Sequence, residues 1–182
     1  MGRNVEIKAR LVDPEACFER ARAIADGPEQ ELAQRDTFFA SAQGRLKLRE
    51  LSERVGCLIY YERPDAEGPK LSRYILTETG DPSGLRTALA AAWGVIGEVR
   101  KRRRLLMVGR TRIHIDAVDG LGDFLELEVV LGRDEPVEAG EAEARRLMTA
   151  LGIGPDALVT GAYHDLLQDR VGAEGEADSQ AD

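Results

Sequence analysis

Apolar and charged residues alternate at every second position in several stretches of this chain. Near its C-terminal third, Leu125, Leu127 and Val129 alternate with the carboxylates Glu126 and Glu128. Such alternation is typical of β-strands, because successive side chains point to opposite faces of a sheet. This pattern, together with the turn residues that separate the stretches, predicts eight strands over residues 4–11, 31–40, 45–51, 56–63, 72–79, 95–108, 111–118 and 124–131.

Helical patterns lie between these strands and after the last one. Asp13-Pro14 and Asp81-Pro82 each provide an N-cap followed by a first-turn proline, a common start of a helix. Helices are predicted over residues 15–25, 85–93, 138–151 and 156–171. Strands joined mostly by short turns, with a few helices beside them, indicate an α+β fold built on an antiparallel sheet. Eight strands are about enough to close a β-barrel that holds a small ligand.

Length and composition favour one soluble globular domain. The 182 residues include 43% hydrophobic and 32% charged residues, and we assign residues 1–171 to a single domain. Residues 172–182 carry acidic but no basic side chains, which predicts a disordered acidic tail. No long apolar run or signal peptide is recognised, so we expect a cytoplasmic protein without a membrane partner. Cys17 and Cys57 lack metal-ligand spacing and are interpreted as free thiols.

Charge is unevenly distributed along the chain. The formal net charge is −8, and the acidic tail supplies four of these negative charges, yet residues 101–104 are all basic. Such a basic run is compatible with nucleic-acid binding. However, no aromatic residues are interleaved with it for base stacking, and the chain as a whole is acidic. We therefore expect no nucleic-acid partner.

The carboxylates of the alternating strands suggest a site for divalent cations. Glu126 and Glu128 lie on one strand face, roughly 6–7 Å apart. Asp116 and Glu6 offer further oxygens of the same kind, and hard cations such as Mg²⁺ or Mn²⁺ take oxygen ligands. The alternative is a solvated outer face, since a half-exposed antiparallel strand has the same pattern.

Cations alternate in the same way and suggest a polyanionic ligand. Several arginines and lysines at one site would suit a triphosphate, which carries close to four negative charges. On the long strand over residues 95–108, periodicity leaves open whether Lys101 and Arg103 or their neighbours face inward. His114 shares a face with Arg112, and a lone histidine is more often structural than a ligand. The candidate cations are Lys8, Arg45, Lys47, Arg49, Arg63, Arg73, Lys101, Arg103 and Arg112.

Two common enzyme classes lack their motifs in this chain. The glycine-rich phosphate loop ending in Gly-Lys-Ser/Thr is absent from the sequence, which excludes a P-loop enzyme. No serine elbow or cysteine–histidine pair indicates nucleophilic catalysis.

The charged motifs, taken in order, resemble the CYTH family, which includes class IV adenylate cyclases and thiamine triphosphatases. That family begins with Glu-x-Glu-x-Lys, and this chain has Asn4-Val-Glu6-Ile-Lys8. The similarity extends over residues 4–167. Its further motifs are Gln34-Arg-Asp36-Thr-Phe-Phe39, Arg45-Leu-Lys47-Leu-Arg49, Tyr61-Glu-Arg63-Pro64, Ser72-Arg73, Val99-x-Lys101-x-Arg103, Arg112-Ile-His-Ile-Asp116, Gly120-Leu-Gly-Asp-Phe-Leu-Glu126-Leu-Glu128 and Ala162-Tyr163-His164-Asp165-Leu-Leu167.

This resemblance implies an eight-stranded antiparallel barrel that forms a triphosphate tunnel with flanking helices. It implies that Lys101 and Arg103 face inward and that the candidate cations bind a triphosphate-bearing small molecule. It further implies a metal site at Glu6, Glu126 and Glu128, assisted by Asp116, with Mg²⁺ or Mn²⁺ as cofactor. The catalytic residues would be Glu6, Lys8, Glu126 and Glu128. Similar proteins are commonly dimers, so a homodimer is one expectation for the oligomeric state.

Three functions are compatible with these residues. The first is metal-dependent hydrolysis of a nucleoside, thiamine or inorganic triphosphate. The second is cyclisation of ATP to cyclic AMP and pyrophosphate by a class IV adenylate cyclase. The third is non-catalytic binding of polyphosphate or a nucleotide, because Asn4 replaces the first carboxylate of the family motif and brings no charge.

Overall fold

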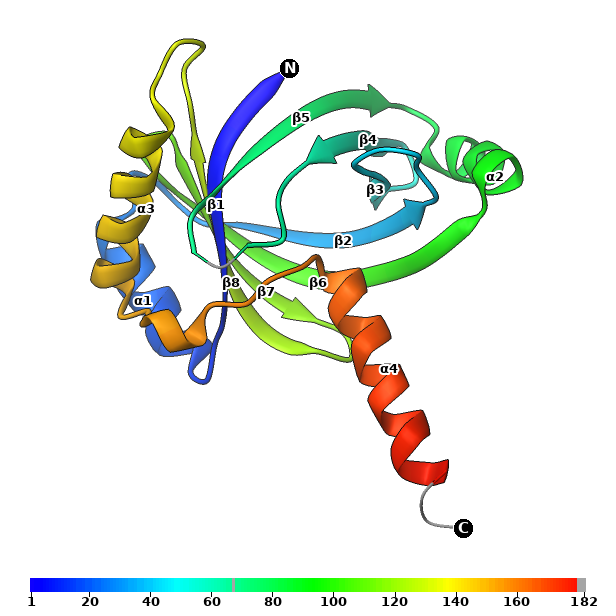
Figure 1. Ribbon diagram of the computed structural model, residues 1–182. Helices are drawn as coiled ribbons and strands as arrows, with labels where there is room; N and C mark the ends of the chain where they lie inside the picture. The colour runs from blue at the N-terminus through cyan, green and yellow to red at the C-terminus, as the bar shows by residue number, and fades with distance from the viewer. Residues whose placement is uncertain (67, 180–182) are drawn as a thin grey trace.

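The computed structural model describes residues 1–66 and 68–179 and forms a closed antiparallel β-barrel with helices around it (Figure 1). The order of strands around the barrel is β1-β5-β4-β3-β2-β6-β7-β8, and β8 pairs with β1 to close it. Both the predicted fold class and the number of strands are confirmed. The elements are β1 (Gly2–Arg10), α1 (Pro14–Ile24), β2 (Gln30–Phe39), β3 (Arg45–Ser52), β4 (Val55–Glu62), β5 (Lys70–Thr79), α2 (Pro82–Trp93), β6 (Val95–Val108), β7 (Thr111–Val118), β8 (Gly122–Val130), α3 (Val137–Leu151), a 3₁₀ turn (Pro155–Ala157) and α4 (Tyr163–Ser179).

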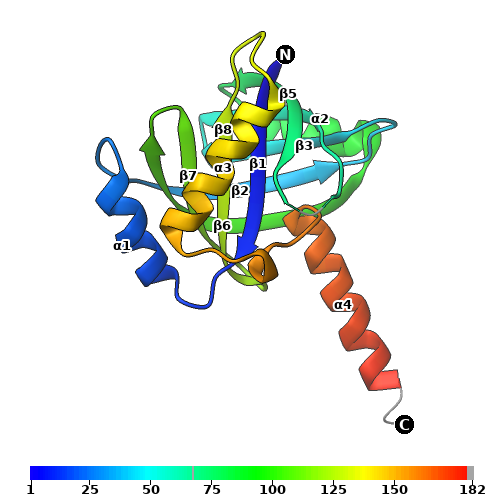
Figure 2. The same ribbon diagram turned by 60° about the vertical axis from the view of Figure 1, so that its left-hand side comes forward.

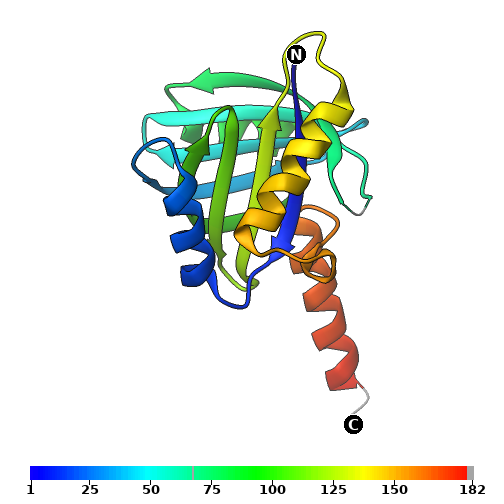
Figure 3. The same ribbon diagram turned by 90° about the vertical axis from the view of Figure 1, so that its left-hand side faces the viewer.

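The main hydrophobic core lies outside the barrel, between its wall and two helices. Helices α1 and α3 lie beside each other across β1, β7 and β8 (Figures 2 and 3). Phe18 of α1 and Leu147 of α3 pack with Val5, Leu127 and Val129 from the outer faces of the strands. Because the apolar positions of these strands face the helices, their charged positions are directed into the barrel.

Local sequence signals set the ends of the helices and one of the turns. The backbone N–H of Ala16 donates to Asp13 at 2.9 Å, and that of Gly84 donates to Asp81 at 2.9 Å. Both predicted N-caps are therefore present. The tight turn between β6 and β7 contains Gly109, whose φ of 55° is a left-handed conformation that favours glycine.

The last helix differs from its prediction. A helix was predicted from residue 156, but α4 begins at Tyr163, and Leu158 and Val159 instead pair with the end of β1. The backbone N–H of Ala162 donates to Asp165 at 2.7 Å, which stabilises the new helix start. The tertiary pairing with β1 thus overrides the local helical pattern.

The boundary between the domain and its tail stays a prediction. Helix α4 extends through Ser179 and so overlaps the predicted tail over residues 172–182, whereas residues 180–182 lie outside the described residues. Cys17 and Cys57 are free thiols, as expected. Among the described residues, no helix has both the length and the apolar character needed to cross a bilayer.

Candidate functional site

The interior of the barrel contains a cavity of about 270 Å³ whose lining comes from all eight strands. Cations outnumber carboxylates among its lining side chains, so the cavity is suited to an anion. Its acids are Glu6, Asp36, Glu126 and Glu128. Its cations are Lys8, Lys47, Arg49, Arg63, Lys101, Arg103 and Arg112.

The structure decides which cations of β6 face inward. Lys101 and Arg103 are 4% and 3% exposed and line the cavity, whereas Arg100 and Arg102 are exposed on the outer face. This orientation agrees with the family resemblance and resolves the ambiguity that periodicity alone left open.

Asp36 organises the first group of cations. Arg49 donates to both carboxylate oxygens of Asp36 at 2.8 and 2.7 Å, and Lys47 donates to the same group at 2.9 Å. Burial opposes ionisation of Asp36, but the charges of Arg49 and Lys47 outweigh it and hold its pKa well below the usual value. Asp36 was not predicted as a site residue. It alternates with outward-facing residues of β2 in the same way as Gln34 and Phe38, which also line the cavity.

Asp116 organises a second group in the same way. Arg103 donates to both oxygens of Asp116 at 2.6 Å, Lys101 donates at 2.9 Å, and the hydroxyl of Tyr163 donates at 3.0 Å. Thus β2–β3 and β6–β7 each carry one buried aspartate that binds a Lys-x-Arg pair. Asp116 was predicted to assist a metal, but here its oxygens are occupied by these donors.

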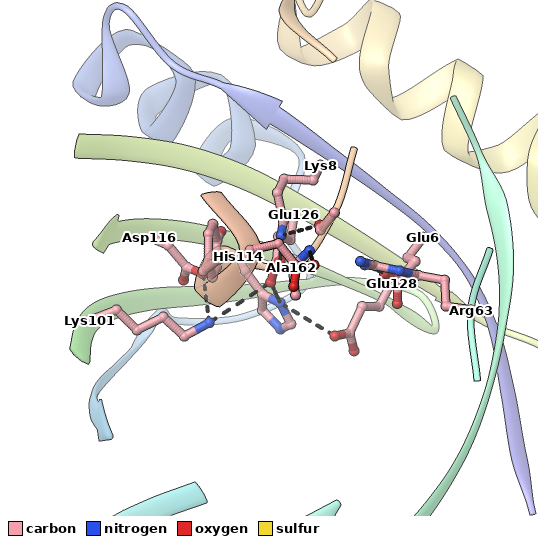
Figure 4. A network of polar contacts seen from close by, with 12 residues as sticks. Glu6, Lys8, Arg63, Lys101, His114, Asp116, Glu126, Glu128 and Ala162 are labelled. Carbon is pink, nitrogen blue, oxygen red and sulfur yellow. Dashed lines mark hydrogen bonds and ion pairs between the residues drawn. The ribbon is translucent and has the colours of Figure 1, made fainter. Parts of the chain in front are cut away.

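The carboxylates of β1 and β8 form the acidic side of the cavity (Figure 4). Glu126 accepts from Arg103 at 2.6 Å, and its second oxygen lies 3.4 Å from the ammonium of Lys8. Burial opposes ionisation of Glu126, but Lys101, Lys8 and Arg103 outweigh it and lower its pKa well below the usual range. Glu126 is therefore a carboxylate at neutral pH.

Glu6 and Glu128 are the other two carboxylates on the acidic side of the cavity. Glu6 pairs closely with Arg63, and Glu128 accepts from Arg112 at 3.1 Å. Burial is the main cause that raises the pKa of Glu6, because Arg63 only partly offsets the loss of hydration.

His114 contributes a nitrogen to the same acidic side. Ligand atoms of His114, Glu126 and Glu128 all lie within 4.8 Å of one another. Nδ1 of His114 and the amide oxygen of Asn4 are buried and have no hydrogen-bond partner among the described residues. A set of carboxylates with further unpartnered donor atoms fits a divalent cation, so this part of the cavity is a candidate metal site.

One end of the cavity is closed by the start of α4. Ala162 and Tyr163 line this end, and the Lys8 ammonium donates to the carbonyl of Gly161 at 3.1 Å and lies 3.8 Å from the centre of the Tyr163 ring. Burial is the main cause that lowers the pKa values of Lys8 and Lys101 to about 8. Both side chains therefore remain mainly protonated at neutral pH.

The opposite end has a different, more apolar lining. Along β6, the inward positions run from Val99, beside Tyr163, through the cations to Leu105, away from α4. Leu32 and Leu76 also line the cavity, as does Tyr74, which pairs with the N-terminal end of β1. An organic group attached to a phosphate chain would find apolar surface here.

Two predicted substrate-binding residues lie outside the cavity. Arg73 is exposed on the outer face of β5, because Ser72 and Tyr74 occupy the inward positions beside it. Arg45 pairs with Asp65 at 2.7 Å and with Asp165 at 3.0 Å and does not line the cavity. The structure therefore places Arg73 on the outer face of β5 and Arg45 at the periphery of the site.

Sequence comparison gives one family for nearly the whole chain. The profile of the CYTH domain matches residues 2–163. No curated protein matches the chain.

Solved structures of the same architecture come from distant organisms. The PH1012 protein from Pyrococcus horikoshii OT3 is 22% identical, with a TM-score of 0.79 over 90% of this chain and 99% of that one. A proposed adenylate cyclase from Vibrio parahaemolyticus is 22% identical, with a TM-score of 0.71 over 91% and 97%. The HpAC1 protein from Hippeastrum, described as having a dominant triphosphatase activity, is 17% identical, with a TM-score of 0.63 over 91% and 95%. At these identities the likeness establishes the fold.

Proposed function

The chain belongs to the CYTH domain family, and from this premise we propose that it is a divalent-metal-dependent hydrolase of triphosphate-containing compounds. The observation that carries the proposal is the excess of cations over carboxylates among the side chains that line the interior of a closed barrel. The triphosphatase activity described for the similar Hippeastrum protein supports the same reaction class.

The two aspartate-bound groups and Lys8 would bind the phosphate chain. Lys47 and Arg49 are held by Asp36, while Lys101 and Arg103 are held by Asp116, so their positions are fixed before substrate arrives. Preorganised cations stabilise the charge that develops on phosphoryl oxygens without further rearrangement. Arg63 and Arg112 would add charge beside the acidic side of the cavity.

Glu6, Glu126 and Glu128 would hold the divalent cation. When bound, the ion supplies positive charge that polarises the phosphoryl oxygens. In the hydrolytic reaction, a water oxygen attacks the terminal phosphorus, the bond to the bridging oxygen breaks, and orthophosphate is released. The cavity residues would orient the phosphate chain for this displacement.

The apolar end of the cavity favours a triphosphate that carries an organic group over inorganic triphosphate. Leu32, Leu76, Leu105 and Tyr74 offer contact surface that a bare phosphate chain would not use. The same surface also suits the second candidate, cyclisation of ATP. There the ribose 3′-hydroxyl attacks the α-phosphorus and pyrophosphate leaves.

One product assay tests the proposal against its alternatives. The protein is incubated with ATP, thiamine triphosphate and inorganic triphosphate, each with Mg²⁺ or Mn²⁺ and with a chelator control. We expect metal-dependent release of orthophosphate, fastest from an organic triphosphate. Cyclic AMP with pyrophosphate would identify a cyclase instead, and tight binding without turnover would identify a non-catalytic binder.

Arg49→Ala is expected to weaken substrate binding more than it slows turnover. Loss of a hydrogen-bonding guanidinium from a charged contact costs about 1.5–3 kcal/mol, or roughly a 10- to 100-fold rise in KM. Steady-state kinetics on the preferred triphosphate measures the effect. Arg73→Ala is the matched control, because Arg73 lies on the outer face. Unchanged KM and kcat for Arg49→Ala would contradict the proposed role.

A further inference from the structure

We propose that His114 is a nitrogen ligand of the metal site and that it makes this site prefer first-row transition-metal ions over Mg²⁺. The inference rests on the metal dependence proposed above, but it does not depend on which triphosphate reaction follows. Neither the charge pattern of the strands nor the family motif assigned a role to this side chain.

Nδ1 of His114 has no hydrogen-bond partner within residues 1–66 and 68–179. The side chain lies on β7 and is only 3% exposed. A buried polar atom without a partner costs about 1–3 kcal/mol, so Nδ1 needs a partner such as a bound ion or an ordered water. Histidine ligates metal ions through a ring nitrogen that carries a free lone pair.

The distances around Nδ1 suit a shared ion. Nδ1 lies 3.8 Å from Oε1 of Glu128 and 4.0 Å from Oε2 of Glu126, too far for direct hydrogen bonds (Figure 4). Two ligand atoms on one metal, each about 2.0–2.2 Å from it, are about 3–4 Å apart. Nδ1 and Oε1 of Glu128 therefore lie at a separation suited to one shared ion. Oε2 of Glu126, which accepts from Arg103 at 2.6 Å, would have to shift to join them.

The neighbouring charges explain why this donor set would disfavour Mg²⁺. Magnesium prefers an all-oxygen shell, whereas imidazole binds first-row transition metals well. The carboxylates are also partly neutralised, because Glu126 is bonded to Arg103, Glu128 to Arg112 and Glu6 to Arg63. A site with few free negative charges and one nitrogen donor therefore binds a transition-metal ion more tightly than it binds Mg²⁺.

Pulsed electron paramagnetic resonance of bound Mn²⁺ tests the ligation directly. Wild-type protein should give a ¹⁴N coupling typical of a coordinated imidazole. His114→Asn replaces the nitrogen donor with an amide oxygen and should abolish the coupling. His164→Asn is the matched control, because the other histidine of the chain stacks on Phe38 and does not line the cavity. It should retain the signal.

Calorimetric titration with Co²⁺ and Mg²⁺ tests the preference. We expect wild type to bind Co²⁺ more tightly than Mg²⁺. In His114→Asn we expect Co²⁺ affinity to fall by about 10- to 100-fold, with a change in Mg²⁺ affinity of less than about threefold.

Bound Mn²⁺ without nitrogen coupling in wild type would overturn the inference, even if His114→Asn fails to fold. Equal losses for both ions in the variant would also overturn the claimed preference. The same measurements test the proposed hydrolysis separately from the proposed ligand. Metal-dependent phosphate release without nitrogen coupling refutes only the ligand, whereas nitrogen coupling without turnover supports the ligand and refutes the hydrolase.

Discussion

Glu126→Gln is expected to lower kcat on the preferred triphosphate by about 10²–10³-fold or more, as the loss of one preorganised electrostatic group in an active site does. Glu126 has ionic contacts with Lys8, Lys101 and Arg103, so its charge lies between the proposed metal and phosphate positions. The amide keeps the shape of the side chain but removes that charge. We expect Glu128→Gln to have a comparable effect on turnover.

In these variants kcat should fall while the affinity for triphosphate does not. Removal of a carboxylate makes the cavity more positive, so affinity for inorganic triphosphate without metal should be retained or increased. Calorimetry measures this affinity, steady-state kinetics measures kcat, and circular dichroism checks the fold. Glu31→Gln is a matched control, because Glu31 is an exposed glutamate on β2. Undiminished activity in both Glu126→Gln and Glu128→Gln would remove these residues from the metal site.

Asp36→Asn is expected to lower the free energy of unfolding by about 3–5 kcal/mol, because removal of one partner leaves buried charges uncompensated. Lys47 and Arg49 both lie against this carboxylate, and Asp36 is only 2% exposed. Inorganic triphosphate should restore part of the loss, because its charge can replace that of the carboxylate and it binds only the folded state. Chemical denaturation at neutral pH, with and without this ligand, measures both effects.

The stability that Asp36 contributes should decrease as the pH becomes acidic. The pKa of Asp36 in the folded protein is lowered well below its ordinary value. Its contribution is therefore fully present above about pH 4 and is lost as the pH falls towards the folded-state pKa. The difference between wild type and Asp36→Asn should shrink over that acidic range. Asp65→Asn is the control, because this half-exposed partner of Arg45 should contribute at most about 1 kcal/mol. A loss in Asp36→Asn no larger than in the control would contradict the role given to Asp36.

Sequence determined the strands and the chemistry of the cavity because both depend on local alternation. Leu125, Glu126, Leu127 and Glu128 predict one apolar and one charged face whatever strand lies beside them. Helix starts at Asp13 and Asp81 were equally local, since each cap bonds a backbone group three residues away.

Tertiary structure decided which charged groups meet and which of them remain free. The pairing of β2 with β3 places Asp36 against Arg49, and the pairing of β6 with β7 places Asp116 against Arg103. The curvature of the sheet turns Arg73 to the outer face. The pairing of β7 with β8 brings His114 beside two carboxylates, and its Nδ1 has no hydrogen bond to any residue that the structure describes. These relations depend on the register of the pairs β2–β3, β6–β7 and β7–β8, which alternation along a single strand does not determine. A period of two gives the two faces of a strand, but only the pairing and curvature of the closed sheet decide which face is enclosed and which side chains touch across it.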